Sequence, residues 1–199
     1  MYLEYDGSID KLRRRLFQKV LNRLALPQGA TLLDYGCGPG DFLQEAQKRG
    51  IKAFGVDISD YSIKIARNRG LEVSKTTADE LVKSGAKFDA IVVQSVIEHV
   101  DDATSMMRSL CRLLTSNGAL VISSPTPGPY FWDDPTHIRP YTPRALLVLG
   151  ELSEVHCEYL GYVFGFLLGM EIRNPLIFPA MNIIPLSLGS NIIAFFRAN

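Results

Sequence analysis

Net charge, paired cysteines and a secretory leader are all missing from this sequence. Basic and acidic residues number 21 each, so no long-range field draws a nucleic acid to the protein. The three cysteines are odd in number and far apart, without a Cys-x-x-Cys pair or a histidine at metal-ligand spacing. Residues 1–7 are acidic and lack the basic and apolar regions of a signal peptide. We therefore expect a cytoplasmic protein with no metal and no nucleic-acid partner.

What is present is the composition of one folded domain. Hydrophobic residues make up 47% of the chain and aromatic residues 10%, which is typical of a globular protein. A length of 199 residues lies within the range of a single compact domain. We expect residues 1–199 to form one domain with an N-terminal helix or lid at residues 1–28 and an apolar insertion at residues 159–190.

Strand-like and helix-like segments alternate along the chain. After an amphipathic helix at residues 8–25, capped by Ser8, apolar runs of strand length are separated by stretches with helical periodicity. Buried strands that alternate with helices form a parallel sheet with both faces covered, so we expect a doubly wound α/β fold. Ligands of such sheets bind at the carboxyl ends of the strands. The expected strands are residues 30–35, 53–57, 88–94, 119–123, 155–162 and 191–196, and the further helices are residues 41–49, 60–68, 103–114 and 143–152.

A glycine-rich turn follows the first of these strands. Asp34 lies near the end of the strand, and the glycines come at alternate positions after it, where they let the backbone approach a ligand that any side chain would block. The glycines are Gly36, Gly38 and Gly40. Such a turn alone is a weak signal, because it also occurs as a tight strand-to-helix connection.

Asp57 supplies a second feature. It ends the next strand of the same strand-helix-strand unit, where a carboxylate accepts hydrogen bonds from both hydroxyls of a ribose. Both NAD and S-adenosylmethionine (SAM) contain an adenosine. The glycines follow a Gly-x-Gly-x-Gly pattern in place of the dinucleotide pattern Gly-x-Gly-x-x-Gly, and Pro39 removes one backbone N–H from the turn. Both differences favour a ligand without phosphates.

Four segments, in this order, resemble the class I SAM-dependent methyltransferase family. They are the glycine turn at residues 33–40, the acidic strand end at 55–59, the strand and its continuation at 88–100, and the segment at 113–122. The resemblance implies a Rossmann-like sheet of seven strands, mostly parallel with an antiparallel last strand. It also implies SAM as the cofactor and S-adenosylhomocysteine as its product.

The resemblance further implies which residues contact the cofactor. The glycines pass under the methionine and ribose, Asp34 helps to hold the amino end, and Asp57 takes the ribose hydroxyls. The usual aspartate of the adenine turn aligns with Thr77, and Asp79 is a rival for that contact. The implied contacts are Asp34, Gly36, Gly38, Gly40, Asp57, Ile58, Thr77, the Ala78 backbone, Gln94 and Ser95.

Two histidines lie where an acceptor would be methylated. The resemblance implies that His99 shapes its loop. His137 follows the strand at 119–123, in a loop over the carboxyl edge of the sheet, and is our candidate general base for a hydroxyl acceptor. In the alternative interpretation, His137, Arg139 and Asp134 only tie the loop down.

Two further groups are open to more than one interpretation. The aromatic residues Phe131, Trp132 and Tyr141 either line an acceptor pocket or pack the loop. The arginines at residues 13–15 either belong to a lid over the site or form a solvated basic face.

The C-terminal region is apolar. From residue 159 onward the charged residues are Glu171, Arg173 and Arg197, and several prolines interrupt the stretch, which argues against a membrane-spanning helix. The insertion at 159–190 either packs on the domain or on a second copy in a homodimer, or it touches a membrane surface or a lipid-like acceptor. A membrane-peripheral location is therefore an alternative to a purely cytoplasmic one.

Together these features predict a SAM-dependent methyltransferase that acts on a small-molecule or lipid-linked acceptor, with oxygen as the expected acceptor atom. The sequence lacks the Asn-Pro-Pro-Tyr type of motif with which related enzymes methylate nucleobase nitrogen. One alternative is a non-catalytic SAM-binding or scaffolding module, which would keep the same cofactor residues. The other is a nicotinamide-dependent oxidoreductase, which would need a Tyr-x-x-x-Lys or similar pair that the sequence lacks.

Overall fold

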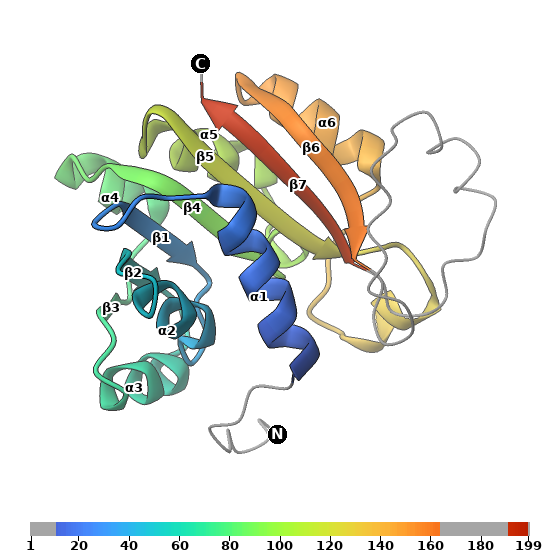
Figure 1. Ribbon diagram of the computed structural model, residues 1–199. Helices are drawn as coiled ribbons and strands as arrows, with labels where there is room; N and C mark the ends of the chain where they lie inside the picture. Colours follow the sequence, from blue (N-terminus) through green and yellow to red (C-terminus); the bar gives the residue numbers. More distant parts are fainter. Residues whose placement is uncertain (1–10, 164–190, 199) are drawn as a thin grey trace.

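A sheet lies between two layers of helices in the computed structural model, which describes residues 11–163 and 191–198 (Figure 1). Within these residues seven strands follow the order β3-β2-β1-β4-β5-β7-β6. They are β1 (Thr31–Tyr35), β2 (Lys52–Val56), β3 (Val73–Ser74), β4 (Phe88–Gln94), β5 (Leu114–Pro125), β6 (Val155–Val163) and β7 (Asn191–Ala198). Strands β1 to β5 pair in parallel, and β7 is antiparallel to both β5 and β6. The predicted sheet, mostly parallel with an antiparallel last strand, is confirmed.

Helices cover both faces of the sheet. One face carries α1 (Lys11–Leu24), α2 (Asp41–Gln47) and α3 (Asp60–Asn68), and the other carries α4 (Ala78–Ser84), α5 (Ala103–Arg112) and α6 (Pro143–Leu152). Two short 3-10 helices, η1 (Ile97–His99) and η2 (Pro129–Asp133), follow β4 and β5. This is the doubly wound architecture that alternating strands and helices predicted.

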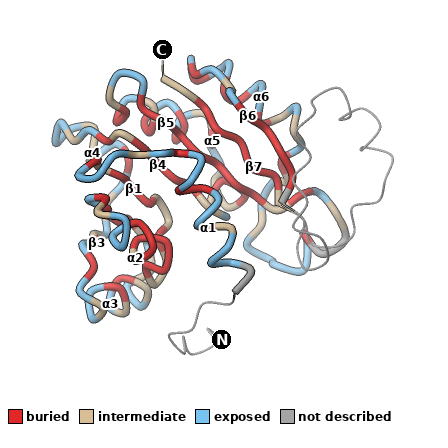
Figure 2. The backbone as a smooth tube through the Cα atoms, viewed as in Figure 1, coloured by how far each residue is buried: buried red, intermediate tan, exposed pale blue. Residues whose placement is uncertain are grey.

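The sheet separates two apolar cores. In β4, Ala90 and Val92 pack with the residues of α1 to α3, whereas Ile91 and Val93 pack with those of α4 to α6. Figure 2 shows the central strands buried along most of their length. Burial of a valine or isoleucine side chain contributes about 1.5–3 kcal/mol, so a strand covered on both faces is apolar at most of its positions.

The beginning of β5 differs from the prediction. A helix was expected to run through Leu114 and a strand to begin at Ala119, but α5 ends at Arg112 and Leu114 already pairs with Phe88 of β4. Between Leu114 and Ala119 the register with β4 shifts, and Asn117 has a φ of 62°. Such an irregularity lets a strand resume after a turn, and the Asn-Gly pair at its centre was interpreted as a helix stop.

Strand β3 and helix α4 were absent from the sequence prediction. β3 has two residues and α4 has seven, which is too short for a clear periodicity. The available signal was the capping box of α4, in which Thr77 and Glu80 bond reciprocally across the first turn.

Helix α1 is part of the core. Phe17, Val20 and Leu21 are buried, and the edge of the Phe17 ring meets the Phe42 ring of α2 with centroids 5.2 Å apart. The predicted cap Ser8, the predicted lid residues before Lys11, and most of the apolar insertion (residues 164–190) lie outside the described residues. Among the helices that the structure describes, none is long and apolar enough to cross a membrane.

Candidate active site

The glycine turn lies where the carboxyl ends of β1, β2 and β4 meet. The backbone amides of Gly36 and Cys37 donate to the Val56 carbonyl oxygen at 2.7 and 2.9 Å. These bonds fasten the turn to the end of β2, directly before Asp57. Because β1 also pairs in register with β4, Gln94 lies at the same edge. The topology therefore brings the predicted cofactor residues of three strands together.

The three glycines of the turn have left-handed φ angles and different surroundings. The angles are 82° at Gly36, 54° at Gly38 and 86° at Gly40. A Cβ on Gly36 would overlap the Val96 side chain, and a Cβ on Gly40 would overlap that of Leu71. A Cβ on Gly38 would meet no atom within 4 Å in the described part of the chain. Packing thus requires two of the glycines, and the third borders open space in which a ligand fits.

Two backbone amides hold the Asp57 carboxylate. Gly38 donates to its Oδ2 and Ser59 donates to its Oδ1, both at 2.8 Å. A carboxylate offers about four acceptor positions, so two remain for the hydroxyls of a ribose. The next side chain, Ile58, is 84% exposed and offers an apolar surface beside the carboxylate. That pairing suits an adenosine.

Asp34 lies buried below the turn. Burial, reinforced by the negative charge of Asp57, raises the pKa of Asp34 from 3.8 to about 7, and Arg13 of α1 opposes the rise. A cationic partner would stabilise the ionised form of this buried carboxyl. The amino group that the sequence prediction assigned to Asp34 is such a partner.

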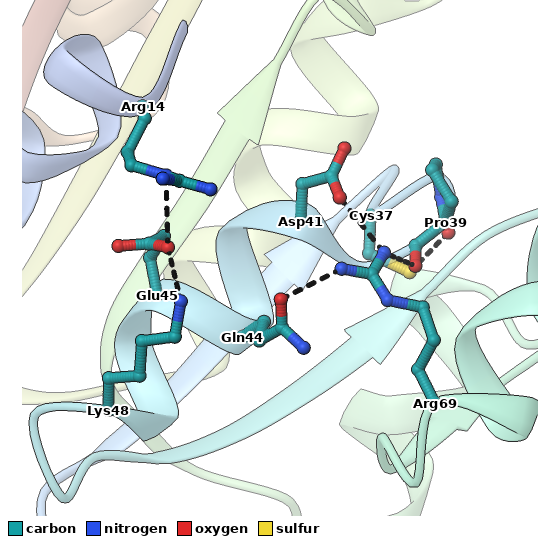
Figure 3. A network of polar contacts seen from close by, with 9 residues as sticks. Arg14, Cys37, Pro39, Asp41, Gln44, Glu45, Lys48 and Arg69 are labelled. Carbon is teal, nitrogen blue, oxygen red and sulfur yellow. Dashed lines mark hydrogen bonds and ion pairs between the residues drawn. The ribbon is translucent and has the colours of Figure 1, made fainter. Parts of the chain in front are cut away.

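Arg69, at the end of α3, holds the turn from outside (Figure 3). Its Nη1 donates to the Pro39 carbonyl oxygen at 2.6 Å and to Asp41 at 2.9 Å, and its Nη2 donates to Gln44 at 3.0 Å. The guanidinium therefore joins α3, α2 and the glycine turn. Sequence analysis missed Arg69, because a single arginine far along the chain carries no local signal.

Gln94 and Ser95 border the turn from β4. Ser95 has a φ of 50°, and its amide donates to the Ser123 carbonyl oxygen at 2.9 Å. Gln94 is half-buried and Ser95 is exposed. Both lie beside Val96, whose side chain packs against Gly36. They are thus placed to contact a ligand in the turn.

The predicted adenine residues are already engaged in the protein. The Thr77 hydroxyl accepts from the Glu80 amide at 3.2 Å, and the Thr77 amide donates to the Glu80 carboxylate at 2.9 Å. The Ala78 amide donates to the hydroxyl of Tyr35. The rival Asp79 accepts from a serine hydroxyl of α5 at 2.5 Å. Thr77 and Asp79 are both exposed, and only Oδ1 of Asp79 accepts this bond, so side-chain contact of either residue with adenine stays a prediction.

His137 lies in the loop after β5 with one ring nitrogen occupied. Its Nδ1 is 2.6 Å from the Phe131 carbonyl oxygen, which only accepts, so Nδ1 carries the proton. In the neutral ring Nε2 then has a free lone pair, 3.8 Å from Oδ2 of Asp134. This is the tautomer that a general base at Nε2 requires.

The structure brings His99 and His137 together, with ring centroids 4.7 Å apart. The Nδ1 atom of His99 lies 3.1 Å from the carbonyl oxygen and 3.0 Å from the hydroxyl oxygen of Thr136. The Thr136 hydroxyl donates to Asp134 at 2.6 Å, so it accepts from His99. The carbonyl oxygen of Glu98 also accepts from the Ile138 amide at 2.8 Å. These bonds tie η1 to the loop.

Glu98 is a polar group that sequence analysis passed over. Its side chain is fully buried, and neither carboxyl oxygen has a hydrogen-bond partner of standard geometry among the described residues. Burial raises the pKa of Glu98, and its own backbone amide, His99, the Ser124 hydroxyl and His137 lower it in part. The buried Tyr141 hydroxyl also lacks a partner in the described ranges. Burial raises the pKa of Tyr141, Arg139 opposes the rise and the negative charge of Glu98 adds to it.

The aromatic residues of the loop divide between packing and exposure. Phe131 is buried and contacts the rings of Trp132 and His137, with centroids 5.0 and 4.4 Å away. Trp132 is 62% exposed, and Tyr141 belongs to the core on the α5–α6 side. Only Trp132 of the three predicted pocket residues is free to meet an acceptor.

Comparison with known proteins identifies the chain. The sequence model of the methyltransferase domain family matches residues 9–151. The chain belongs to this family. The ubiquinone biosynthesis O-methyltransferase of Arabidopsis thaliana mitochondria is 36% identical over 105 residues, which are 49% of this chain and 33% of that protein. The enzyme of the same name from Xanthomonas campestris pv. campestris is 34% identical over 113 residues, 53% of this chain and 46% of that protein.

A solved structure agrees with the family assignment. A SAM-dependent methyltransferase from Archaeoglobus fulgidus is 24% identical, with a TM-score of 0.71 over 94% of this chain and 96% of that one, which shows the shared fold. The family match confirms the predicted family, its enzyme class and SAM as its cofactor, and the solved structure confirms the fold. The matched regions span less than half the length of the two curated relatives. The open side of Gly38, the exposed Ile58 and the held carboxylate of Asp57 fit SAM.

Proposed function

We propose that the protein transfers the methyl group of SAM to a hydroxyl oxygen of a small-molecule or lipid-linked acceptor. The observation that carries the proposal is the contact of His137 Nδ1 with the Phe131 carbonyl oxygen. The Nδ1 proton is bonded to this backbone oxygen, which leaves Nε2 as a base beside the edge where the cofactor residues gather. A hydroxyl acceptor needs such a base, whereas an already ionised acceptor does not.

The residues of the chain divide the work. When bound, SAM supplies a methyl group on a positively charged sulfur, which leaves as a neutral thioether. Asp57 accepts hydrogen bonds from the ribose hydroxyls, and Asp34 faces the amino group of SAM. The turn around Gly38 orients the part of SAM that joins the ribose to the amino group. His137 Nε2 takes the proton of the attacking hydroxyl, and Asp134 stabilises the imidazolium that forms.

The relatives support oxygen as the acceptor atom. Both curated relatives are named as O-methyltransferases of ubiquinone biosynthesis, and the aligned regions cover about half of this chain. A lipid-linked acceptor also suits the apolar sequence of residues 159–190. Contact of that segment with a membrane surface or with a second copy remains a prediction outside the described residues.

Transfer of labelled methyl from SAM to a panel of phenols, catechols, amines and thiols, with and without alkyl tails, tests the acceptor. We expect labelling of hydroxyl acceptors. His137→Gln should lower kcat roughly 10²- to 10⁴-fold, the range of general-base catalysis, and leave the Kd for SAM unchanged. His156→Gln is the matched control, because this histidine is exposed on β6.

Three results would count against the proposal. Labelling of amines alone would move the acceptor atom to nitrogen. Tight SAM binding with no transfer to any acceptor would favour a non-catalytic SAM-binding module. Full activity in His137→Gln would show that His137 is not the general base.

A further inference from the structure

Two of the three histidines of the protein meet one fully buried glutamate at the end of β4. One ligand atom from each of Glu98, His99 and His137 lies within 4.8 Å of the others. Glu98 and His99 come from η1, and His137 comes from the loop after β5. Because these segments are far apart in sequence, local spacing of cysteine and histidine gave no sign of the cluster, and the sequence prediction was that no metal binds.

The carboxyl group of Glu98 lacks a hydrogen bond of standard geometry in the described part of the chain. It is completely buried, and the lack of a partner holds for both of its oxygens. The buried hydroxyl of Tyr141 is also unbonded in that part of the chain. Buried polar groups in proteins nearly always have partners, and an unpaired carboxylate is among the least favourable groups to bury. A bound cation would supply the missing partner.

Both histidines are oriented as metal ligands are. His99 donates from Nδ1 to Thr136, and His137 donates from Nδ1 to the Phe131 carbonyl oxygen. Histidines that bind metals usually donate the other ring N–H to a carbonyl or carboxylate, which fixes the tautomer and directs the free nitrogen at the ion. Here each Nε2 is the free nitrogen. The outer contacts continue, because the Thr136 hydroxyl donates to Asp134.

We propose that Glu98, His99 and His137 form a binding site for a divalent transition-metal ion. Two imidazoles and one carboxylate are the ligand set of open zinc sites and of non-haem iron sites. Bonds to zinc are about 2.0–2.2 Å long, so the ligand atoms of a tetrahedral site lie about 3.4 Å apart. From within 4.8 Å of one another, the three atoms must approach by at most about 1.4 Å. The Oδ2 atom of Asp134, 3.8 Å from His137 Nε2, borders the site.

The metal site does not depend on the proposed methyl transfer. An ion would occupy the lone pair with which His137 acts as a base, so the two roles exclude each other at any one moment. Zinc lowers the pKa of a bound water to about 7, and by the same effect a bound ion would promote ionisation of an acceptor hydroxyl without a base at His137. Metal binding is measured on the protein alone, without SAM or acceptor.

Titration of chelator-treated protein with Co²⁺ and Zn²⁺ tests the site. We expect one ion per chain, seen as visible absorption of bound Co²⁺ that Zn²⁺ displaces, and by calorimetry with Zn²⁺. Glu98→Gln, His99→Ala and His137→Ala should each lower the affinity at least about 100-fold, beyond the usual effect of losing an outer partner. Thr136→Val should lower it by about 10-fold. The control His156→Ala should bind as the wild type does.

Calorimetric titration of every variant with SAM shows whether the fold is kept. Wild-type SAM affinity together with lost Co²⁺ absorption in the three ligand variants supports the proposal. Absence of a Co²⁺ signal in the wild type would overturn it. Loss of binding in His156→Ala, or unchanged binding in Glu98→Gln, would also overturn it, since the ion would then bind elsewhere. SAM affinity reports on the cofactor side separately, so a failure of metal binding does not count against SAM binding.

Discussion

The cofactor side and the acceptor side of the active site differ in how fully their polar groups are paired. On the cofactor side, Asp57 accepts two backbone amides and Arg69 makes three bonds around the glycine turn. On the acceptor side, the buried Glu98 and Tyr141 have polar atoms without partners among the described residues. The first arrangement holds its geometry in the protein alone, while in our proposal a bound ion completes the second.

This difference predicts separate effects for the two sides. Variants near Asp57 should change the affinity for SAM and leave metal binding intact. Variants of Glu98, His99 and His137 should do the reverse. A protein in which every variant changed both would have one cooperative site, and the comparison would fail.

Asp34 gives the strongest test of this comparison, because it is an ionisable group buried on the cofactor side, where the other polar groups are paired. Its pKa of about 7 in the folded protein exceeds the ordinary 3.8, so folding favours the protonated form. The stability contribution is full below about pH 4 and falls as the pH rises through about 7, by about 4 kcal/mol. Asp34→Asn keeps the shape without the carboxyl, so relative to the wild type it should become more stable by most of that amount between these limits.

Urea unfolding of both proteins across this pH range measures the effect. A cationic amino group of SAM stabilises the ionised form of Asp34, so wild-type SAM affinity should also rise as the pH increases through about 7, and Asp34→Asn should flatten that rise. If the unfolding free energies of the two proteins changed in the same way with pH, ionisation of Asp34 would carry no energetic cost in the folded state.

Asp57→Ala sharpens the comparison on the cofactor side. Loss of the ribose hydrogen bonds should weaken SAM binding by about 1.5–3 kcal/mol, the scale of hydrogen bonds to a charged group. Asp60→Ala is the matched control. Asp60 is the first residue of α3, three residues after Asp57, and it pairs with Lys75 at an exposed position. Calorimetry with SAM measures both. Equal affinities would remove Asp57 from the ribose site.

Gly36→Ala and Gly38→Ala distinguish a glycine that packing requires from a glycine that leaves space for the ligand. Both glycines have left-handed φ angles, so alanine at either position costs about 1–2 kcal/mol of stability. Only at Gly36 does the new Cβ also overlap Val96, so its unfolding free energy should fall further. Gly38→Ala should keep the fold and lose at least about tenfold in SAM affinity, because the methyl enters the open space. Equal losses of stability would contradict this assignment.

Much of the fold and of the cofactor side was predictable from sequence, because both depend on local patterns. Continuous apolar runs predicted the strands, and the spacing of glycines after Asp34 predicted the turn. Asp57 followed from its place at the end of the next strand. These residues lie within one strand-helix-strand unit, so sequence distance and spatial distance are closely related.

The acceptor side was less predictable, because its contacts join distant segments. Glu98 stands between Ile97 and His99, and nothing nearby in the sequence shows that it will be buried beside His137. The tautomer of His137 depends on the carbonyl oxygen of Phe131, which any residue could supply. Thr77 was assigned to adenine by alignment, although the capping box with Glu80 was visible in the sequence.

Thr77 therefore gives the smallest effect and a direct choice between two roles. As the cap of α4 it accepts from the Glu80 amide, and its removal in Thr77→Ala should cost about 1 kcal/mol of stability. Thr77→Ser keeps the hydroxyl and should restore most of that loss. If Thr77 acts only as the cap, SAM affinity measured by calorimetry stays the same in both variants. A loss of affinity in Thr77→Ala that Thr77→Ser reverses would instead place the hydroxyl on the adenine, and the cofactor side would then include a side chain that the protein shares between its own helix and its ligand.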